Sequence, residues 1–175
     1  MSDLEFLPEG RPRFGPGAVR DAFVRLYLRV GYRVITVGWW LFRPHTEGAQ
    51  VAIWVDQRVL VIRNSYRRGL ALPGGAPKRG EALIDTAVRE LREETGVRVA
   101  SEHLSEALEV EQTTEYKRDR VQIFEAELFE CPELRVDRRE VTVAGFTDPR
   151  KLDREMLHYP LRKYLEWRAG LDGRP

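Results

Sequence analysis

One stretch of this chain, residues 75–97, restricts the possible folds more than any other. It reads G-A-P-K-R-G-E-A-L-I-D-T-A-V-R-E-L-R-E-E-T-G-V. Glu90, Glu93 and Glu94 stand at positions i, i+3 and i+4, which places their carboxylates on one face of an α-helix. Apolar residues at helical spacing are Ile84, Ala87, Val88 and Leu91. The pattern therefore predicts a helix that docks one side on a core and presents carboxylates on another.

Three carboxylates on one exposed patch repel each other unless a cation lies among them. Carboxylate oxygens suit a hard divalent cation, Mg²⁺ or Mn²⁺, and the segment contains no cysteine or methionine to offer a soft sulfur ligand. The alternative interpretation is a solvated acidic helix end. The other fixed positions of the segment favour the metal site.

The segment resembles the Nudix box, G-x5-E-x7-R-E-U-x-E-E-x-G-U with U apolar, and matches it at every defined position. This resemblance implies an α/β protein with the α/β/α sandwich of the Nudix fold, a mixed β-sheet, and the box as a loop–helix–loop. The rest of the chain agrees, because strand-like runs alternate with helical segments. The strand-like runs are residues 51–55, 59–63, 70–72, 105–112, 120–129 and 141–147. Asp56 and Gln57 form a turn pattern between the first two, and a closing helix is expected from Pro160.

The resemblance also assigns roles. Glu90 and Glu94, with Glu93 alongside, would bind Mg²⁺ or Mn²⁺, and the carbonyl of Gly74 would be a further ligand. In similar proteins the residue matching Arg89 orients the carboxylates by a salt bridge. Glu81 is expected at the start of the helix, where capping and a minor metal role both remain open.

The reaction implied is hydrolysis of a diphosphate linkage by water attack on phosphorus. Such a linkage is anionic and inert, so hydrolysis needs charge neutralisation, a positioned water and a base. The base in such enzymes is either a box glutamate, here Glu93, or one from a later strand or loop. The later candidates are Glu115, Glu125, Glu127 and Glu140, of which Glu140 is preferred because it heads a strand-like stretch.

The resemblance implies that the substrate is a small nucleotide, a nucleoside diphosphate linked to another moiety. No subfamily mark is complete: Thr113 occupies the position of the proline found in ADP-ribose-type members, and Tyr116 is offset from the tyrosine of dinucleoside polyphosphate hydrolases. Tyr66, Arg67 and Arg68 are candidates for base stacking and phosphate contacts. An exposed loop without substrate contacts is the alternative.

Two other functions are considered. A Nudix-fold nucleotide-binding or regulatory module without turnover would bind ligand and release no product, but such modules usually lose box carboxylates, which this chain keeps. The Nudix-related isopentenyl diphosphate isomerases, which isomerise a diphosphate ester, use a cysteine ahead of the box region, whereas the only cysteine of this chain is Cys131, well after the box.

The chain is expected to divide into a flexible arm at residues 1–17, an amphipathic helix at residues 18–43 and the Nudix domain at residues 44–175. The helix carries an arginine row and could be an extra helix packed on the domain, a dimerisation element, or a basic helix at a lipid surface with Trp39 and Trp40 at the boundary. It is interrupted by arginines and is therefore not a membrane span.

A formal net charge of +1 argues against a nucleic-acid partner bound through a large global field. One cysteine excludes an internal disulfide. The chain does not open on a secretory signal pattern, so a cytoplasmic location is expected.

Overall fold

The computed structural model describes residues 30–31, 45–66, 68–114, 117–136 and 140–172. Apart from residues 30 and 31, which are helical, the expected arm and N-terminal helix lie outside the described residues. The strands are β1 His45–Val55, β2 Arg58–Asn64, β3 Gly74–Gly75, β4 Ser105–Thr114, β5 Lys117–Leu128 and β6 Val141–Thr147. The helices are α2 Leu83–Thr95 and α3 Tyr159–Asp172, with short 3₁₀ turns at Ser101–His103, Pro149–Lys151 and Arg154–Met156.

The strands form one mixed sheet in the order β4-β5-β1-β2-β6, with β3 paired to β1. β1 runs parallel to β5 over its whole length and antiparallel to β2 and β3. The expected mixed sheet is therefore confirmed. β1 can take the central place because residues 51–55 are apolar and buried on both faces of the sheet.

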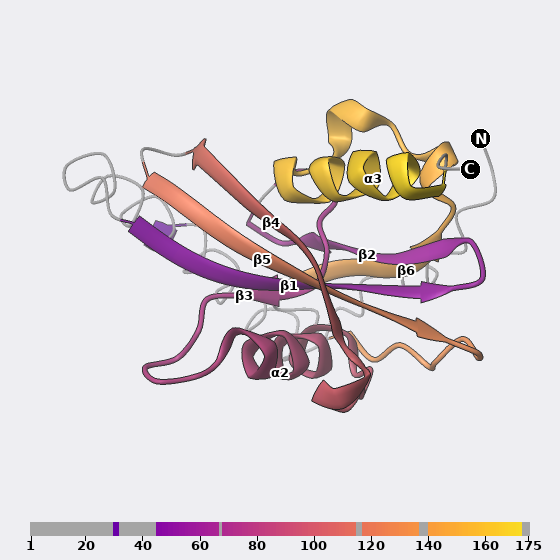
Figure 1. Ribbon diagram of the computed structural model, residues 1–175, viewed down its shortest axis with the longest axis horizontal. Helices are drawn as coiled ribbons and strands as arrows, with labels where there is room; N and C mark the ends of the chain where they lie inside the picture. The colour runs from indigo at the N-terminus through magenta and orange to yellow at the C-terminus, as the bar shows by residue number, and fades with distance from the viewer. Residues whose placement is uncertain (1–29, 32–44, 67, 115–116, 137–139, 173–175) are drawn as a thin grey trace, which may run out of the picture.

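Side chains of β1 alternate between two cores. Val51 and Ile53 pack with Ala87 and Leu91 of α2, whereas Trp54 on the other face packs with Tyr164 of α3. Figure 1 shows α2 and α3 on opposite sides of the sheet. This arrangement follows from the period-two alternation of a strand and confirms the α/β/α sandwich.

A hydrogen-bonded chain fastens α3 to the sheet. The Nε1 of Trp54 donates to the hydroxyl of Tyr164 at 2.7 Å, and that hydroxyl donates to Glu125 at 2.5 Å. Arg168 donates to the same carboxylate at 2.7 Å and its guanidinium lies 4.5 Å from the centre of the Trp54 ring. Burial and the hydrogen bond to Glu125 raise the pKa of Tyr164, so the hydroxyl stays protonated and can donate.

The turn between β1 and β2 is confirmed, with Asp56 in the left-handed region at φ 55°. The prediction of a strand at residues 70–72 is wrong, because no strand forms there. Leu70 and Ala71 make only isolated bridges, to Leu157 and Ile62 respectively, because each lies opposite a different segment. Within the described residues, no helix is long and apolar enough to cross a membrane.

Candidate functional site

The loop before α2 is built around Glu81, which lies outside the helix. The helix begins at Leu83, and its N-cap, Ala82, makes no side-chain capping bond. Glu81 Oε2 instead accepts hydrogen bonds from the amide of Lys78 at 2.8 Å and the hydroxyl of Thr86 at 3.0 Å. The expectation that Glu81 begins the helix is thus wrong. Of the two roles left open, capping is not seen, because the carboxylate is committed to the loop and to an arginine, and the minor metal role stays a prediction.

That arginine is Arg89, and it connects the loop to the helix. Its Nε and Nη2 donate to the two oxygens of Glu81, each at 2.8 Å. Its Nη1 donates to Glu90 at 2.6 Å and lies 3.4 Å from Glu93. All three guanidinium nitrogens are therefore engaged by carboxylates, and the side chain is only 13% exposed. This geometry matches the expected orienting salt bridge and leaves no free edge for a substrate.

Glu94 departs from the expected exposed patch, since this residue is 6% exposed. Its Oε2 accepts a 2.9 Å hydrogen bond from the amide of Gly74 in β3. Glu93, by contrast, has a side chain that is 48% exposed. The three carboxylates share a helix face, but α2 packs so that the last one points under the Gly74–Gly75 strand.

Glu90 lies against the other glycine of β3. A Cβ added at Gly75 would sit 2.6 Å from Oε1 of Glu90. A side chain at this position would displace the carboxylate, so glycine is needed for the close approach. The two glycines of β3 thus position the two carboxylates in different ways. The amide of Gly74 donates a hydrogen bond to Glu94, whereas Gly75, which has no side chain, leaves space for Glu90.

The carboxylates perturb one another. Burial, followed by the charges of Glu90, Glu140 and Glu93, raises the pKa of Glu94 to about 8, against the lowering effect of the Gly74 hydrogen bond. The hydrogen bond from Arg89 is the main reason that the pKa of Glu81 falls to about 2. The loop carboxylate is therefore compensated, whereas the buried one lies among like charges.

A divalent cation would compensate Glu94. Among the described residues, no group of three or more His, Cys, Asp or Glu side chains is arranged as a metal cage. The donor chemistry nevertheless fits a hard cation, because Glu90 and Glu94 offer carboxylate oxygens beside the half-buried glycines of β3. Hard cations of this kind are held by one or two carboxylates together with other oxygens, so a three-carboxylate cage is not required.

The structure separates the later glutamates that were candidates for the base. Glu125 and Glu127 are paired with Arg168 on the face covered by α3, so they lie across the sheet from the box. Glu140 is on the box side, close enough for its charge to raise the pKa of Glu94. Glu115 lies outside the described residues.

The loop after β2 lies beside Glu140. The amide of Ser65 donates to the carbonyl of Glu140 at 2.7 Å. At the other end of the loop, the ring of His158 is hydrogen-bonded to the carbonyl of Arg68 at 2.6 Å. The hydroxyl of Tyr66 accepts a 3.3 Å hydrogen bond from Asn64, and Arg67 lies outside the described residues.

Sequence reasoning did not single out Ser65 or His158. Both act through backbone hydrogen bonds to residues distant in the chain. No local spacing announces such contacts. The pairing of Asn64 with Val141 brings Ser65 to Glu140. The bridge between Leu70 and Leu157 brings Arg68 to His158.

Comparisons with known proteins agree with this arrangement. The family model described as NUDIX domain matches residues 44–168. No curated protein sequence was found to match the chain.

Solved structures match more widely, and each shows the same fold at low sequence identity. A MutT NUDIX hydrolase from Burkholderia pseudomallei has a TM-score of 0.63 and 22% identity, covering 70% of this chain and 97% of its own. An Ap4A hydrolase from C. elegans has a TM-score of 0.61 and 18% identity, covering 74% and 99%. A bifunctional NMN adenylyltransferase/ADP ribose pyrophosphatase from Francisella tularensis, complexed with AMP and a Mn ion, has a TM-score of 0.62 and 18% identity, covering 82% and 47%.

Proposed function

Because this chain belongs to the NUDIX domain family and is an enzyme of the pyrophosphohydrolase type, we propose that it hydrolyses a nucleoside diphosphate linked to another moiety. The observation that supports this substrate class is the group of carboxylates around Glu94, beside Gly74 and Gly75. Such a group of carboxylates can bind a divalent cation, and the positive charge of that cation can neutralise an anionic diphosphate.

The cofactor proposed is Mg²⁺ or Mn²⁺, held by Glu90 and Glu94, with Glu93 and the Gly74 carbonyl as further ligands. Once bound, the cation supplies Lewis-acid stabilisation of the phosphoryl oxygens. The amide of Gly74 fixes one oxygen of Glu94. Arg89 holds Glu90 and Glu81 in one orientation and acts as a positioning residue.

A water must also lose a proton as it attacks phosphorus. Two carboxylates are proposed for this step, Glu93 and Glu140. Glu93 is the most exposed carboxylate held by Arg89, and Glu140 is on the same side of the sheet, within electrostatic reach of Glu94. The two are distinguished by pH–rate profiles of Glu93→Gln and Glu140→Gln, because loss of the base removes the acidic limb of the profile.

Substrate contacts are proposed for Tyr66, Arg67 and Arg68. Ser65 ties the described part of this loop to Glu140, and the side chain of Arg68 is exposed. An aromatic ring and two guanidinium groups can stack on a base and bind phosphate. An unchanged KM in Tyr66→Ala would argue against this role.

The deciding experiment is a turnover screen with Mg²⁺. Its panel contains nucleoside triphosphates, nucleotide sugars, ADP-ribose and Ap4A, the last two because structural relatives are named for them. Glu94→Gln is run beside the native protein. Cleavage of one class by the native protein alone supports the proposal, whereas nucleotide binding without product would replace it with a binding module.

A further inference from the structure

A polar cavity lies at one end of the sheet, away from the buried part of β1. It is formed where β1 and β5 begin and β4 ends, three strand ends that lie side by side in Figure 1. Its volume is about 680 Å³, within the range typical of small-molecule sites. The lining residues are Thr46, Glu47, Glu111, Gln112, Thr113, Arg118, Asp119 and Arg120.

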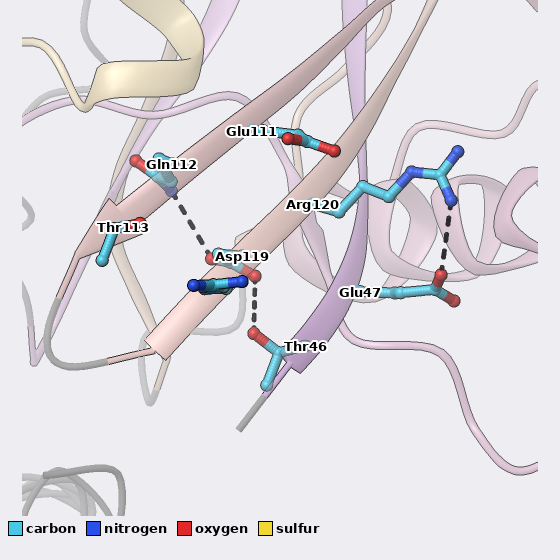
Figure 2. Close-up of a pocket in the computed structure, with 8 residues that line it drawn as sticks. Thr46, Glu47, Glu111, Gln112, Thr113, Asp119 and Arg120 are labelled. Carbon is cyan, nitrogen blue, oxygen red and sulfur yellow. Dashed lines mark hydrogen bonds and ion pairs between the residues drawn. The ribbon is translucent and has the colours of Figure 1, made fainter. Parts of the chain in front are cut away.

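One row of lining side chains forms hydrogen bonds within itself. Thr46, Asp119 and Gln112 stand opposite one another on the three strands. The hydroxyl of Thr46 donates to one oxygen of Asp119 at 2.8 Å, and Gln112 donates to the other at 3.5 Å, as Figure 2 shows. This row braces the strand ends, and we assign no ligand to it.

The neighbouring row points to the opposite face, which is the face covered by α2, because side chains alternate along each strand. In this row Arg120 lies 2.5 Å from Glu109 and 3.7 Å from Glu47. Its charge is therefore balanced within the protein. Figure 2 shows the contact between Arg120 and Glu47.

Glu111 and Arg118 differ from these residues. Within the described part of the chain, neither side chain forms a hydrogen bond or an ion pair, although the charge of Glu111 acts on Arg120, the residue opposite it. Glu111 pairs with Arg120, and Thr113 pairs with Arg118. Glu111 and Arg118 are therefore diagonal neighbours on one face of the sheet, about 7–8 Å apart at the backbone. An open acceptor and an open donor thus line one cavity within reach of one small group.

The charge of the lining restricts what that group can be. Three carboxylates, Glu47, Glu111 and Asp119, outnumber Arg118 and Arg120. A further phosphate would meet a net negative surface and be repelled. A neutral group with hydroxyl, amino or carbonyl functions could instead bind to both Glu111 and Arg118.

The cavity is close to the box carboxylates. Glu47 is two residues from Ala49, which pairs with Gly75, and Gly75 lies against Glu90. Two residues of strand and one cross-strand pair give a backbone path on the order of 12 Å. Both positions lie on the α2 face, so one substrate can span them.

We propose that this cavity binds the neutral part of the substrate, a sugar or nucleobase joined to the diphosphate, with Glu111 accepting hydrogen bonds from it and Arg118 donating to it. This inference rests on the proposed function for the position of the diphosphate. It makes Glu111 and Arg118 specificity residues, and it predicts a preference for diphosphates that carry a neutral group at each end over nucleoside triphosphates.

The kinetic test compares native protein, Glu111→Gln and Arg118→Gln on a nucleotide sugar and on the matching nucleoside triphosphate. We expect each variant to raise KM for the nucleotide sugar about tenfold, the value of one hydrogen bond to a charged group, with kcat within about twofold. Glu106→Gln is the matched control, because Glu106 is an exposed carboxylate on the same strand, outside the cavity. Equal KM values in native protein and both variants would overturn the proposal.

A binding test needs no turnover and separates this inference from the proposed function. Calorimetry in EDTA would titrate the nucleoside monophosphate and the sugar phosphate separately into native protein. Binding of either one that weakens about tenfold in Glu111→Gln supports the cavity and identifies which half enters it. If both variants bind each compound as tightly as native protein does, or if neither the nucleoside monophosphate nor the sugar phosphate binds, the cavity proposal is refuted even when hydrolysis is observed.

Discussion

The amide of Gly74 donates a 2.9 Å hydrogen bond to Oε2 of Glu94, joining the turn before the box to the last carboxylate of its helix. The bond keeps Glu94 in place although burial and three like charges disfavour its ionised form. A cation bound beside it would therefore stabilise the fold as well as the substrate.

We expect Mg²⁺ or Mn²⁺ to raise the melting temperature of the native protein. At a concentration of one hundred times Kd, binding to the folded state alone contributes about 2.7 kcal/mol. Glu94→Gln should abolish most of this metal-induced rise in melting temperature. It should also lower kcat about 10³-fold, since charge stabilisation by a cation is worth several kcal/mol. The control is Glu102→Gln, an exposed residue outside the box. A full metal-induced shift in Glu94→Gln would remove Glu94 from the ligand set.

The metal-free protein should lose stability as pH rises. The pKa of Glu94 is raised from 4.5 to about 8 in the folded state, so in this window the folded protein retains a proton that the unfolded chain has released. The free energy of unfolding then falls with increasing pH, by a few kcal/mol at most. The lowered pKa of Glu81 acts in the opposite direction and below this window.

Urea unfolding in EDTA, from about pH 5 to about pH 8, measures this dependence. Glu94→Gln should show a flatter profile, because the glutamine does not titrate. Identical profiles for the two proteins would mean that Glu94 is already ionised in the folded state.

Arg89→Lys should lower kcat about 10–100-fold, the usual effect of losing a residue that orients ligands. Lysine cannot reproduce the paired bonds to Glu81 and the simultaneous bond to Glu90. Arg92→Lys is the matched control, since Arg92 is exposed on the same helix. Steady-state kinetics with metal titration make the comparison, and equal kcat values would show that Arg89 is dispensable for orientation.

Gly75→Ala should reduce activity without unfolding the protein. The new Cβ would lie 2.6 Å from Oε1 of Glu90, the end of a flexible side chain that can move away. The carboxylate then leaves its position, and we expect a loss of about tenfold or more in kcat/KM. Gly170→Ala, with open space around it on α3, is the control. Full activity in Gly75→Ala would show that the position of Glu90 is not critical.

Tyr164→Phe should destabilise the protein by about 1–3 kcal/mol, because the buried Nε1 of Trp54 loses its acceptor. The substitution lies on the α3 face, so kcat should not change. Tyr159→Phe keeps the ring contacts to Arg162 and Lys163 and serves as control. Denaturant midpoints and turnover together test whether the two faces are independent, and a large loss of kcat would show that they are not.

Sequence reasoning was most successful where the structure is local. The box spacing predicted α2 and its apolar stripe, since these depend on residues within one or two helical turns. The salt bridge of Arg89 to the box carboxylates was implied by the family resemblance. The turn at Asp56 and the strand Val141–Thr147 were likewise predictable from short patterns.

Features that depend on distant pairing were missed. Burial of Glu94 results from β3 crossing over the end of α2, which no property of the helix itself indicates. Glu81 was expected at the helix start because the sequence does not show that Arg89 and Thr86 fold back to it. Glu125 and Glu140 could be distinguished only once the sheet had assigned each to a face.

Ala49, two residues after Glu47, pairs with Gly75, and this pairing fixes a distance along the sheet. It sets the separation between the cavity and the box carboxylates independently of the residues that line either one. Under the proposed binding mode, exchange of lining residues would change which compound is accepted, while the same bond would still be cut. A one-residue insertion ahead of Ala49 would turn Glu47 to the opposite face and shift the position of cleavage relative to the bound group.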